Sequence, residues 1–253
     1  MDLRTESYSA TDVGSVRELN EDRYFADDDQ RVWAVADGMG GMARGDWAAE
    51  QVVETLRGLV VQGDLEQAVN QLGAAIEDAN SSIVNHSAEI GEQMGSTIVS
   101  LLLRDNIFGV LWVGDSRAYL WREGQLHRLT KDHSQVQEMV DNGLITEDEA
   151  ETHKLRNVLT RAVGIENNFG IGMVQDTVLS DDVFLLCSDG LFGPVKEPEI
   201  ANILEEADDL QEAAEGLIAK CLENGAPDNV TLVLVSAQET TILRLSEAPG
   251  DWL

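Results

Sequence analysis

Apolar residues recur along the first half of the chain with two different spacings. Between residues 46 and 87 they alternate at steps of three and four, which is the spacing of one face of an α-helix. This pattern predicts two helices, over 46–62 and 64–87, and Asp64 and Gln67 are spaced as an N-terminal capping pair. Short aliphatic runs bounded by Gly, Asp or Asn predict strands instead. We expect these strands at 7–14, 32–38, 96–105, 106–115 and 116–124.

The segment 134–156 interrupts this regular pattern. It is polar and contains only short helical pieces, so we interpret it as an insertion that lies over the surface. Regular elements resume after it. They are predicted as strands at 170–178 and 182–190, helices at 197–206 and 209–224, and a last strand at 229–237.

The order of these elements decides between two fold classes. Strands come in two batches and each batch is accompanied by two helices, which favours an α+β fold of antiparallel sheets covered by helices. A doubly wound parallel sheet fits poorly, because the strands do not alternate with helices.

Composition and charge narrow the class of protein. The chain has 253 residues, of which 43% are hydrophobic, and no apolar run reaches the ~18–20 residues that span a bilayer. The first residues lack the layout of a signal peptide. A formal charge of −30 repels nucleic acid and anionic membranes. The two cysteines, Cys187 and Cys221, fit buried apolar positions better than a disulfide framework. We therefore expect a soluble, cytoplasmic protein that binds neither nucleic acid nor membrane.

Several aspartates lie at positions that are not explained by a role in solubility. Asp37, Asp115, Asp189 and Asp228 each begin or end an apolar run beside Gly or Asn, and Asp22 lies in the polar stretch RELNEDRY. One such acid is typical of a turn that hydrogen-bonds its own backbone. Four strand ends meeting at one edge would bring carboxylates into mutual repulsion, which a divalent cation relieves. Because such a site draws on acids more than 200 positions apart, we expect residues 1–253 to form one domain.

Oxygen ligands alone predict a hard cation, Mg²⁺ or Mn²⁺. A structural Ca²⁺ site is the alternative, but the compact D-x-D-x-D-G loop typical of such sites is missing from the sequence. Gly38 would let a backbone carbonyl approach the ion. Arg17 stands five residues before Asp22 and could hold a phosphate with its planar guanidinium. Dispersed aspartates with a nearby arginine favour phosphoryl chemistry.

Eight sequence blocks in order carry a resemblance to a known family. Together they resemble the signature of the metal-dependent protein phosphatases of the protein phosphatase 2C type, in their short bacterial form. The resemblance covers residues 11–235, and each block alone would be weak. The blocks are TDVGSVRELNED (11–22), ADGMGG (36–41), MGSTIV (94–99), VGDSRAYL (113–120), LTKDHS (129–134), NVLTRAVG (157–164), LLCSDGLF (185–192) and PDNVTLVLV (227–235).

The resemblance implies a four-layer αββα sandwich, in which two central antiparallel sheets are flanked by helix pairs, with a bimetallic centre at one end. Asp37 would bridge two Mn²⁺ or Mg²⁺ ions. Asp189 and Asp228 would complete the ligands of one ion. The carbonyl of Gly38 and the side chain of Asp22, the latter through water, would serve the other.

The resemblance also implies features around that centre. Asp115 and Asp189 match the position of a third, weaker metal that bacterial members often hold. Arg17 would bind the substrate phosphate, and 134–156 would be a mobile flap beside the site.

Elementary chemistry gives the same reaction without the family. Two neighbouring ions lower the pKa of a bridging water, and the resulting hydroxide attacks phosphorus in line while Arg17 and the ions neutralise phosphate charge. A covalent cysteine intermediate is not expected, since the sequence has no C-x5-R loop.

The leaving oxygen also needs a proton, and histidine is the usual donor. Many relatives carry a histidine in the glycine turn, where this chain has Met39 and Met42; Met39 is ordinary for bacterial members, and Met42 is the departure. His153 matches a flap histidine of bacterial relatives and is our candidate for the assisting acid, with a metal-bound water as the alternative. We assign the other histidines to packing, surface or flap-anchoring roles: His86, His127 and His133.

These observations predict a Ser/Thr protein phosphatase that reverses a bacterial Ser/Thr kinase and acts as a monomer on phosphorylated proteins. Two other functions remain open from the sequence. A pseudo-phosphatase would bind phosphoproteins without turnover, but such proteins typically lose metal aspartates. A phosphatase of small phosphate esters would carry the same site, and surface charge does not separate it from the first.

Overall fold

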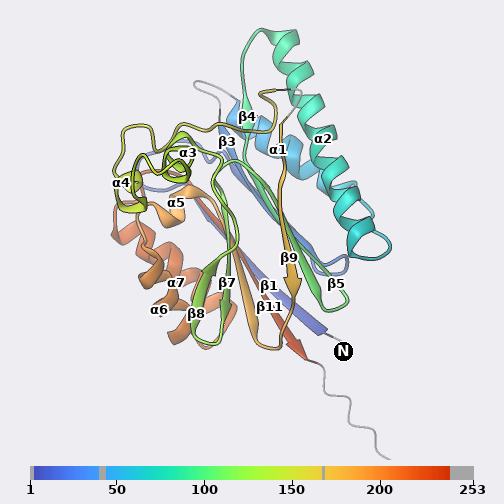
Figure 1. Ribbon diagram of the computed structural model, residues 1–253, viewed down its shortest axis with the longest axis vertical. Helices are drawn as coiled ribbons and strands as arrows, with labels where there is room; N and C mark the ends of the chain where they lie inside the picture. The colour runs from blue at the N-terminus through green and yellow to red at the C-terminus, as the bar shows by residue number, and fades with distance from the viewer. Residues whose placement is uncertain (1–2, 40–43, 167–168, 240–253) are drawn as a thin grey trace, which may run out of the picture.

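Two antiparallel β-sheets form the centre of the molecule (Figure 1). The computed structural model describes residues 3–39, 44–166 and 169–239. Within these ranges the chain forms eleven strands and seven helices. The strands are β1 (Leu3–Asp12), β2 (Asp22–Asp27), β3 (Val32–Met39), β4 (Gly95–Ser96), β5 (Ile98–Arg104), β6 (Ile107–Val113), β7 (Arg117–Arg122), β8 (Gln125–Arg128), β9 (Gly172–Thr177), β10 (Asp182–Cys187) and β11 (Val230–Glu239).

Each sheet combines strands from distant parts of the chain. One sheet has the order β1-β11-β10-β7-β8, and the other has the order β2-β3-β5-β6-β9, with the short β4 paired to the end of β3. The pairing of β1 with β11 joins the two ends of the described chain, from Leu3 opposite Glu239 to Asp12 opposite Val230. The amino- and carboxyl-terminal segments are therefore held in the same sheet.

Helices cover the outer face of each sheet (Figure 1). In these ranges no helix is both long enough and apolar enough to cross a membrane. The helices α1 (Gly45–Arg57) and α2 (Leu65–Ile90) lie on the β2–β9 sheet, and α5 (Asp189–Phe192), α6 (Glu197–Glu206) and α7 (Leu210–Glu223) lie on the other. Two further helices, α3 (Gln135–Asp141) and α4 (Glu147–Glu151), fall in the segment 134–156.

Three apolar clusters correspond to the three interfaces between these four layers. Alternation along β3 shows how one strand serves two of them. Trp33 and Val35 pack between the two sheets, whereas Val32, Ala34 and Ala36 pack under α1 and α2. A strand buried on both faces reads as a continuous apolar run, which is why 32–36 lacks an alternating pattern in the sequence.

The predicted α+β sandwich is therefore the observed fold, and most predicted elements are present. The capping pair of Asp64 and Gln67 begins α2, and α6 has the predicted bounds. The sequence analysis missed β2, β8 and α5. The first helix stops at Arg57 rather than at residue 62, and the apolar residues beyond it pack as a loop, with Leu59 and Val61 against the core and Val60 exposed.

Candidate metal centre

The four strand-end aspartates of the sequence analysis line a single cavity of about 510 Å³. Asp37 is near the end of β3, Asp115 follows β6, Asp189 begins α5 directly after β10, and Asp228 precedes β11. Arg17 is on the wall of the same cavity. The structure therefore brings together side chains that lie up to 211 positions apart in the chain.

The position of this cavity follows from the sheet order. Asp37 lies in β3 and Asp115 follows β6, which are strands of one sheet. Asp189 follows β10 and Asp228 precedes β11, which are strands of the other sheet. The cavity consequently lies across the boundary between the two sheets. Asp22 stands opposite Asp37 in the β2–β3 pairing, but it is buried behind the cavity wall and does not line it.

Burial and mutual repulsion raise the pKa values of Asp37, Asp115 and Asp189. Burial is the larger cause at these three positions, and neighbouring aspartates add to it. Burial, and then the charge of Asp189, raise the pKa of Asp115 to about 8. Burial, and then the charge of Asp228, raise the pKa of Asp189 to about 6. The pKa of Asp37 lies well above its ordinary value, through burial and then through the charges of Asp22 and Asp189. The negative charge of the ionised carboxylates in this cavity therefore exceeds the positive charge that the lining residues supply.

The chemistry of this donor set fits hard divalent cations. The described lining contains six acids, which are Glu18, Glu21, Asp37, Asp115, Asp189 and Asp228, and one base, Arg17. Within 3–39, 44–166 and 169–239 no three Asp, Glu, His or Cys side chains are already grouped closely enough to share one ion. Two of the predicted ligands have other partners, since Asp228 is paired with Arg17 and Asp22 with Ser188. The match to a hard divalent cation therefore rests on the oxygen donors and on the excess negative charge. It does not rest on ligands already arranged around one ion position.

Gly38 is required by helix packing as well as by any role toward an ion. A Cβ atom at this position would collide with the carbonyl of Gly45 at the start of α1. The amide of Gly38 donates to the carbonyl of Glu21 at 3.2 Å, and the amide of Gly45 donates to the carboxylate of Glu21 at 3.1 Å. Close approach of α1 to the end of β3 therefore explains this glycine independently of its place in the cavity lining.

Arg17 is held beside the cavity by an ion pair. Its Nε and Nη2 atoms donate to the two carboxylate oxygens of Asp228 at 2.9 and 2.7 Å, and about half of its side chain remains exposed. Asn229 fixes the loop that carries Arg17, because its side chain accepts from the amide of Glu21 and donates to the carbonyls of Val13 and Leu19. The guanidinium therefore stands at the cavity on an ordered loop.

Histidine does not line the described part of the cavity wall. His153 follows α4, and its Nδ1 accepts from the amide of Leu155 at 3.2 Å, which in the neutral ring leaves the proton on Nε2. His133 anchors the start of the 134–156 segment, with Nδ1 accepting from the amide of Gly114, and burial lowers its pKa to about 4. Met39 lines the cavity, whereas Met42 lies outside the described residues.

The sequence analysis missed a group of buried hydroxyls that hold the aspartates. The hydroxyl of Ser188 donates to Asp22 at 2.7 Å and so links the two sheets at the edge of the cavity. The hydroxyl of Thr97 accepts from the amide of Asp37 at 3.0 Å and lies 2.7 Å from the hydroxyl of Ser116. Ser116 and Ser188 each stand next to an aspartate at the end of an apolar run, whereas Thr97 has neither Gly nor Asp beside it in the sequence.

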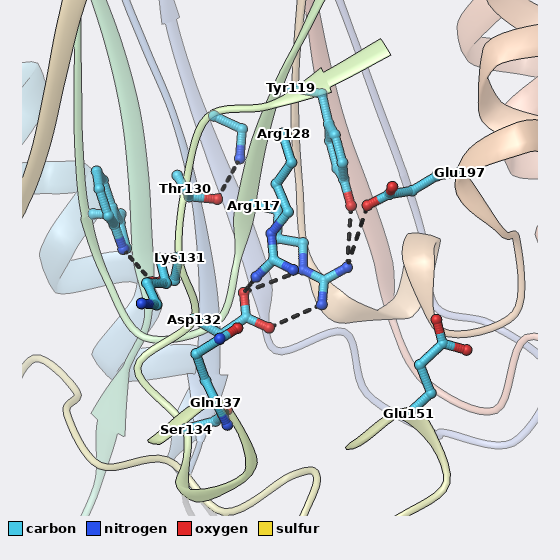
Figure 2. Close-up of polar contacts among 12 residues, drawn as sticks. Arg117, Tyr119, Arg128, Thr130, Lys131, Asp132, Ser134, Gln137, Glu151 and Glu197 are labelled. Atoms are coloured by element: carbon cyan, nitrogen blue, oxygen red, sulfur yellow. Dashed lines mark hydrogen bonds and ion pairs between the residues drawn. The ribbon is translucent and has the colours of Figure 1, made fainter. Parts of the chain in front are cut away.

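A second missed group consists of polar contacts between β7 and the chain that leads into the 134–156 segment (Figure 2). Arg117, two residues after Asp115, donates from Nε and Nη2 to the carboxylate of Asp132 at 3.1 and 2.9 Å. Its guanidinium also lies over the ring of Phe192 in α5, 3.7 Å from the ring centre. Arg128 pairs with the same carboxylate, as Figure 2 shows. One partly buried arginine thus fixes the start of the segment against the helix that begins at Asp189.

Replacing Arg117 with lysine is expected to lower the free energy of unfolding by about 2 kcal/mol. Lysine keeps the charge but loses both the two-point contact with Asp132 and the stacking on Phe192. Urea unfolding measures the change. Arg57→Lys is the matched control, because the exposed pairing of Arg57 with Glu50 should be worth less than ~0.5 kcal/mol. Equal effects of the two changes would contradict a structural role for Arg117.

Comparisons with known proteins agree with this geometry. The Listeria monocytogenes (serotype 4b, strain F2365) serine/threonine phosphatase stp is 35% identical over 239 residues, which cover 91% of this chain and 95% of the relative. The Mycobacterium tuberculosis (strain H37Rv) serine/threonine protein phosphatase PstP is 39% identical over 228 residues, or 88% of this chain and 43% of the relative. This chain therefore spans less than half the length of that second relative.

A solved structure and a family profile complete the comparison. The catalytic domain of the serine/threonine protein phosphatase PstP, solved in complex with two manganese ions, superposes with a TM-score of 0.84 at 35% identity. That superposition covers 94% of this chain and 100% of the other. The family described as Protein phosphatase 2C matches residues 14–229. The chain therefore belongs to the protein phosphatase 2C family.

Proposed function

We propose that this protein hydrolyses phosphoserine and phosphothreonine in other proteins. The observation that carries the proposal is the cavity in which four aspartates from two sheets converge beside Arg17. The phosphatase relatives named above support a protein substrate. We take residues 1–253 as one catalytic unit, a cytoplasmic monomer in which 134–156 is a flap, acting on the substrates of a cognate Ser/Thr kinase.

The same aspartates are our proposal for the metal ligands. Asp37 would be shared by two Mn²⁺ or Mg²⁺ ions, Asp189 and Asp228 would hold one of them, and Asp22 with the Gly38 carbonyl would hold the other. Asp115 with Asp189 would hold a third, weaker ion. Bound there, divalent ions supply an activated water near neutral pH and neutralise charge on the phosphate.

Arg17 would bind the non-bridging phosphate oxygens of the substrate. Its guanidinium already makes a two-point contact with the carboxylate of Asp228, and a phosphate presents the same planar pair of acceptors. The loop held by Asn229 keeps this group at the mouth of the cavity. The role of Arg17 is therefore to orient the ester for attack along the line of the leaving oxygen.

His153 is our proposal for the residue that assists the leaving group. His153→Gln is expected to lower kcat on a phosphothreonine peptide about tenfold or more, because an alkoxide needs a proton, and to change kcat on p-nitrophenyl phosphate little, because a phenolate does not. Parallel steady-state assays measure the two values. Equal losses on both substrates would remove His153 from this role.

Hydrolysis of phosphoserine and phosphothreonine peptides with Mn²⁺, Mg²⁺ or EDTA tests the proposed function directly. We expect phosphate release with either ion and none with EDTA. Phosphate release that persists in EDTA would contradict a metal-dependent reaction. Binding of phosphopeptides without release in any condition would identify a pseudo-phosphatase instead, although all the aspartates that such proteins typically lose stand in this chain.

A further inference from the structure

A second cavity of about 510 Å³ lies next to the candidate metal centre. It is bounded by the end of β3, the residues before β4, and the chain that runs from the 134–156 segment to β9. This volume is in the range of ~300–1,000 Å³ that small-molecule pockets occupy. Polar and apolar side chains share its walls. The apolar ones are Met39, Met94, Leu159, Ala162, Ile165 and Phe169, and the polar ones are Gln93, Thr160, Arg161 and Glu166.

The two cavities share a wall. Met39 and Leu159 line both the second cavity and the cavity that holds the aspartates. Arg17 lines only the metal cavity. The second cavity therefore adjoins the metal cavity at Met39 and Leu159 and not at Arg17. A peptide whose phosphate reached the aspartates could therefore extend directly over Met39 and Leu159.

The wall of the second cavity is fixed by hydrogen bonds to the core. Val163 exchanges two backbone hydrogen bonds with Ser96, at 2.9 and 2.8 Å. The buried Asn80 of α2 accepts from the amide of Gly164 at 2.7 Å and donates to the carbonyl of Glu166 at 3.0 Å. Because this segment is tied to a strand and a helix, the hollow is formed before any ligand arrives.

Charge also separates this cavity from its surroundings. One base and one acid, Arg161 and Glu166, are the charged residues of its described lining, so it carries no net formal charge. The metal cavity has six acids and one base, and the whole chain has a formal charge of −30. An apolar side chain entering the second cavity would avoid the desolvation cost that a charged one would meet there.

We propose that the second cavity receives one large apolar side chain, such as leucine, methionine or phenylalanine, of the phosphoprotein substrate. This side chain belongs to a residue a few positions from the phosphorylated one, because an extended chain advances ~3.3 Å per residue. The inference rests on the proposed function and adds to it a preference for the sequence around the phosphorylated residue. A phosphate ester without a peptide chain lacks this side chain, so it would gain nothing from the second cavity.

A positional leucine scan tests the inference. The peptides carry one phosphothreonine in an alanine background, with a single leucine moved through the four positions on each side. We expect leucine at one or two positions to raise kcat/KM roughly tenfold, the effect of burying most of one aliphatic side chain. Gln93→Trp, at an exposed position on the cavity lining, should fill the cavity and abolish this gain.

Two controls keep the result specific. Gln93→Ala removes the same side chain without filling the cavity, and Val60→Trp adds an indole at an exposed site on the α1–α2 loop, so both should keep the leucine preference. All variants should hydrolyse p-nitrophenyl phosphate and the all-alanine peptide at the wild-type rate. Fluorescence anisotropy of the labelled, dephosphorylated leucine peptide should show tighter binding to the wild type than to Gln93→Trp.

Each outcome decides the inference. Peptide hydrolysis without a preferred leucine position, or with a preference that survives Gln93→Trp, would overturn it and leave the proposed function standing. Hydrolysis of p-nitrophenyl phosphate without any hydrolysis of phosphopeptides would overturn both.

Discussion

Asp189→Ala is expected to lower kcat on a phosphothreonine peptide by about 10²–10³-fold, the loss typical of removing one electrostatic element from an active site. Asp189, like Asp37, is a proposed ligand of two ions, since we assign it to one of the two main ions and to the third. It stands at the start of α5, and the residues on either side of it in the chain, Ser188 and Gly190, carry no carboxylate. Steady-state assays at saturating Mn²⁺ measure the change.

Asp78→Ala is the control for this loss. Asp78 is an exposed acid on α2, outside both cavities, so its removal changes the net charge equally but should leave kcat unchanged. Circular dichroism should show both variants folded. Isothermal titration with Mn²⁺ should show weaker binding by Asp189→Ala alone. Unchanged Mn²⁺ binding, or a kcat within about threefold of the wild type, would exclude Asp189 as a ligand.

The metal-free protein is expected to lose stability as the pH rises from about 5 to about 8. The pKa values of Asp22, Asp115 and Asp189 are raised from an ordinary value near 3.8 to about 7, 8 and 6. In this window the unfolded chain has released these protons and the folded chain still holds them, so the folded state binds more protons and the free energy of unfolding falls with pH. Above the folded pKa values the loss is complete.

A loss of about 3 kcal/mol would lower the melting temperature by roughly 6–12 °C in a chain of this size. Thermal unfolding in EDTA at pH 5 and pH 8 measures it. Saturating Mn²⁺ or Mg²⁺ at pH 8 should restore the stability, because the ions bind the ionised carboxylates of the folded state. Two results would contradict a cluster of buried carboxyl groups at this site. One is a melting temperature that rises with pH in EDTA, and the other is a melting temperature that neither ion changes.

The high net charge supplies a competing explanation for such a pH effect. Repulsion between surface acids also grows with pH, but it is screened by salt. Repeating the melts in about 0.3 M KCl should therefore leave most of the pH dependence in place. Asp37→Asn removes one carboxyl group from the cluster and should flatten it.

Local patterns predicted the elements whose signals are local. The capping pair at Asp64 and the bounds of α6 needed no knowledge of the rest of the fold. The strand β2, with the sequence DRYFAD, was missed because it is an edge strand of mixed polarity and gains its structure from pairing with β3. The end of α1 was misplaced because Leu59 and Val60 continue the helical spacing of apolar residues in the sequence. In the structure both lie in a loop, with Leu59 against the core and Val60 exposed.

Some features of the candidate site were likewise visible in the sequence, and others depend on the complete fold. An aspartate at the end of an apolar run is visible in the sequence, and the convergence of four of them could be inferred from their number. Their supports could not be inferred, because Ser188 meets Asp22 and Arg117 meets Phe192 only when the two sheets and α5 are in place. Even Gly38, which lines the cavity, has a packing reason that only the approach of α1 reveals.

The position of the aspartates across the boundary between the sheets has a mechanical consequence. Ions held by Asp37 from one sheet and by Asp189 and Asp228 from the other would cross-link the sandwich at that edge, much as a disulfide would. Separation of the sheets would then require release of the ions first. The dissociation rate of the metal would accordingly limit how fast the loaded protein unfolds, so catalytic lifetime and resistance to proteolysis would be governed by the same step.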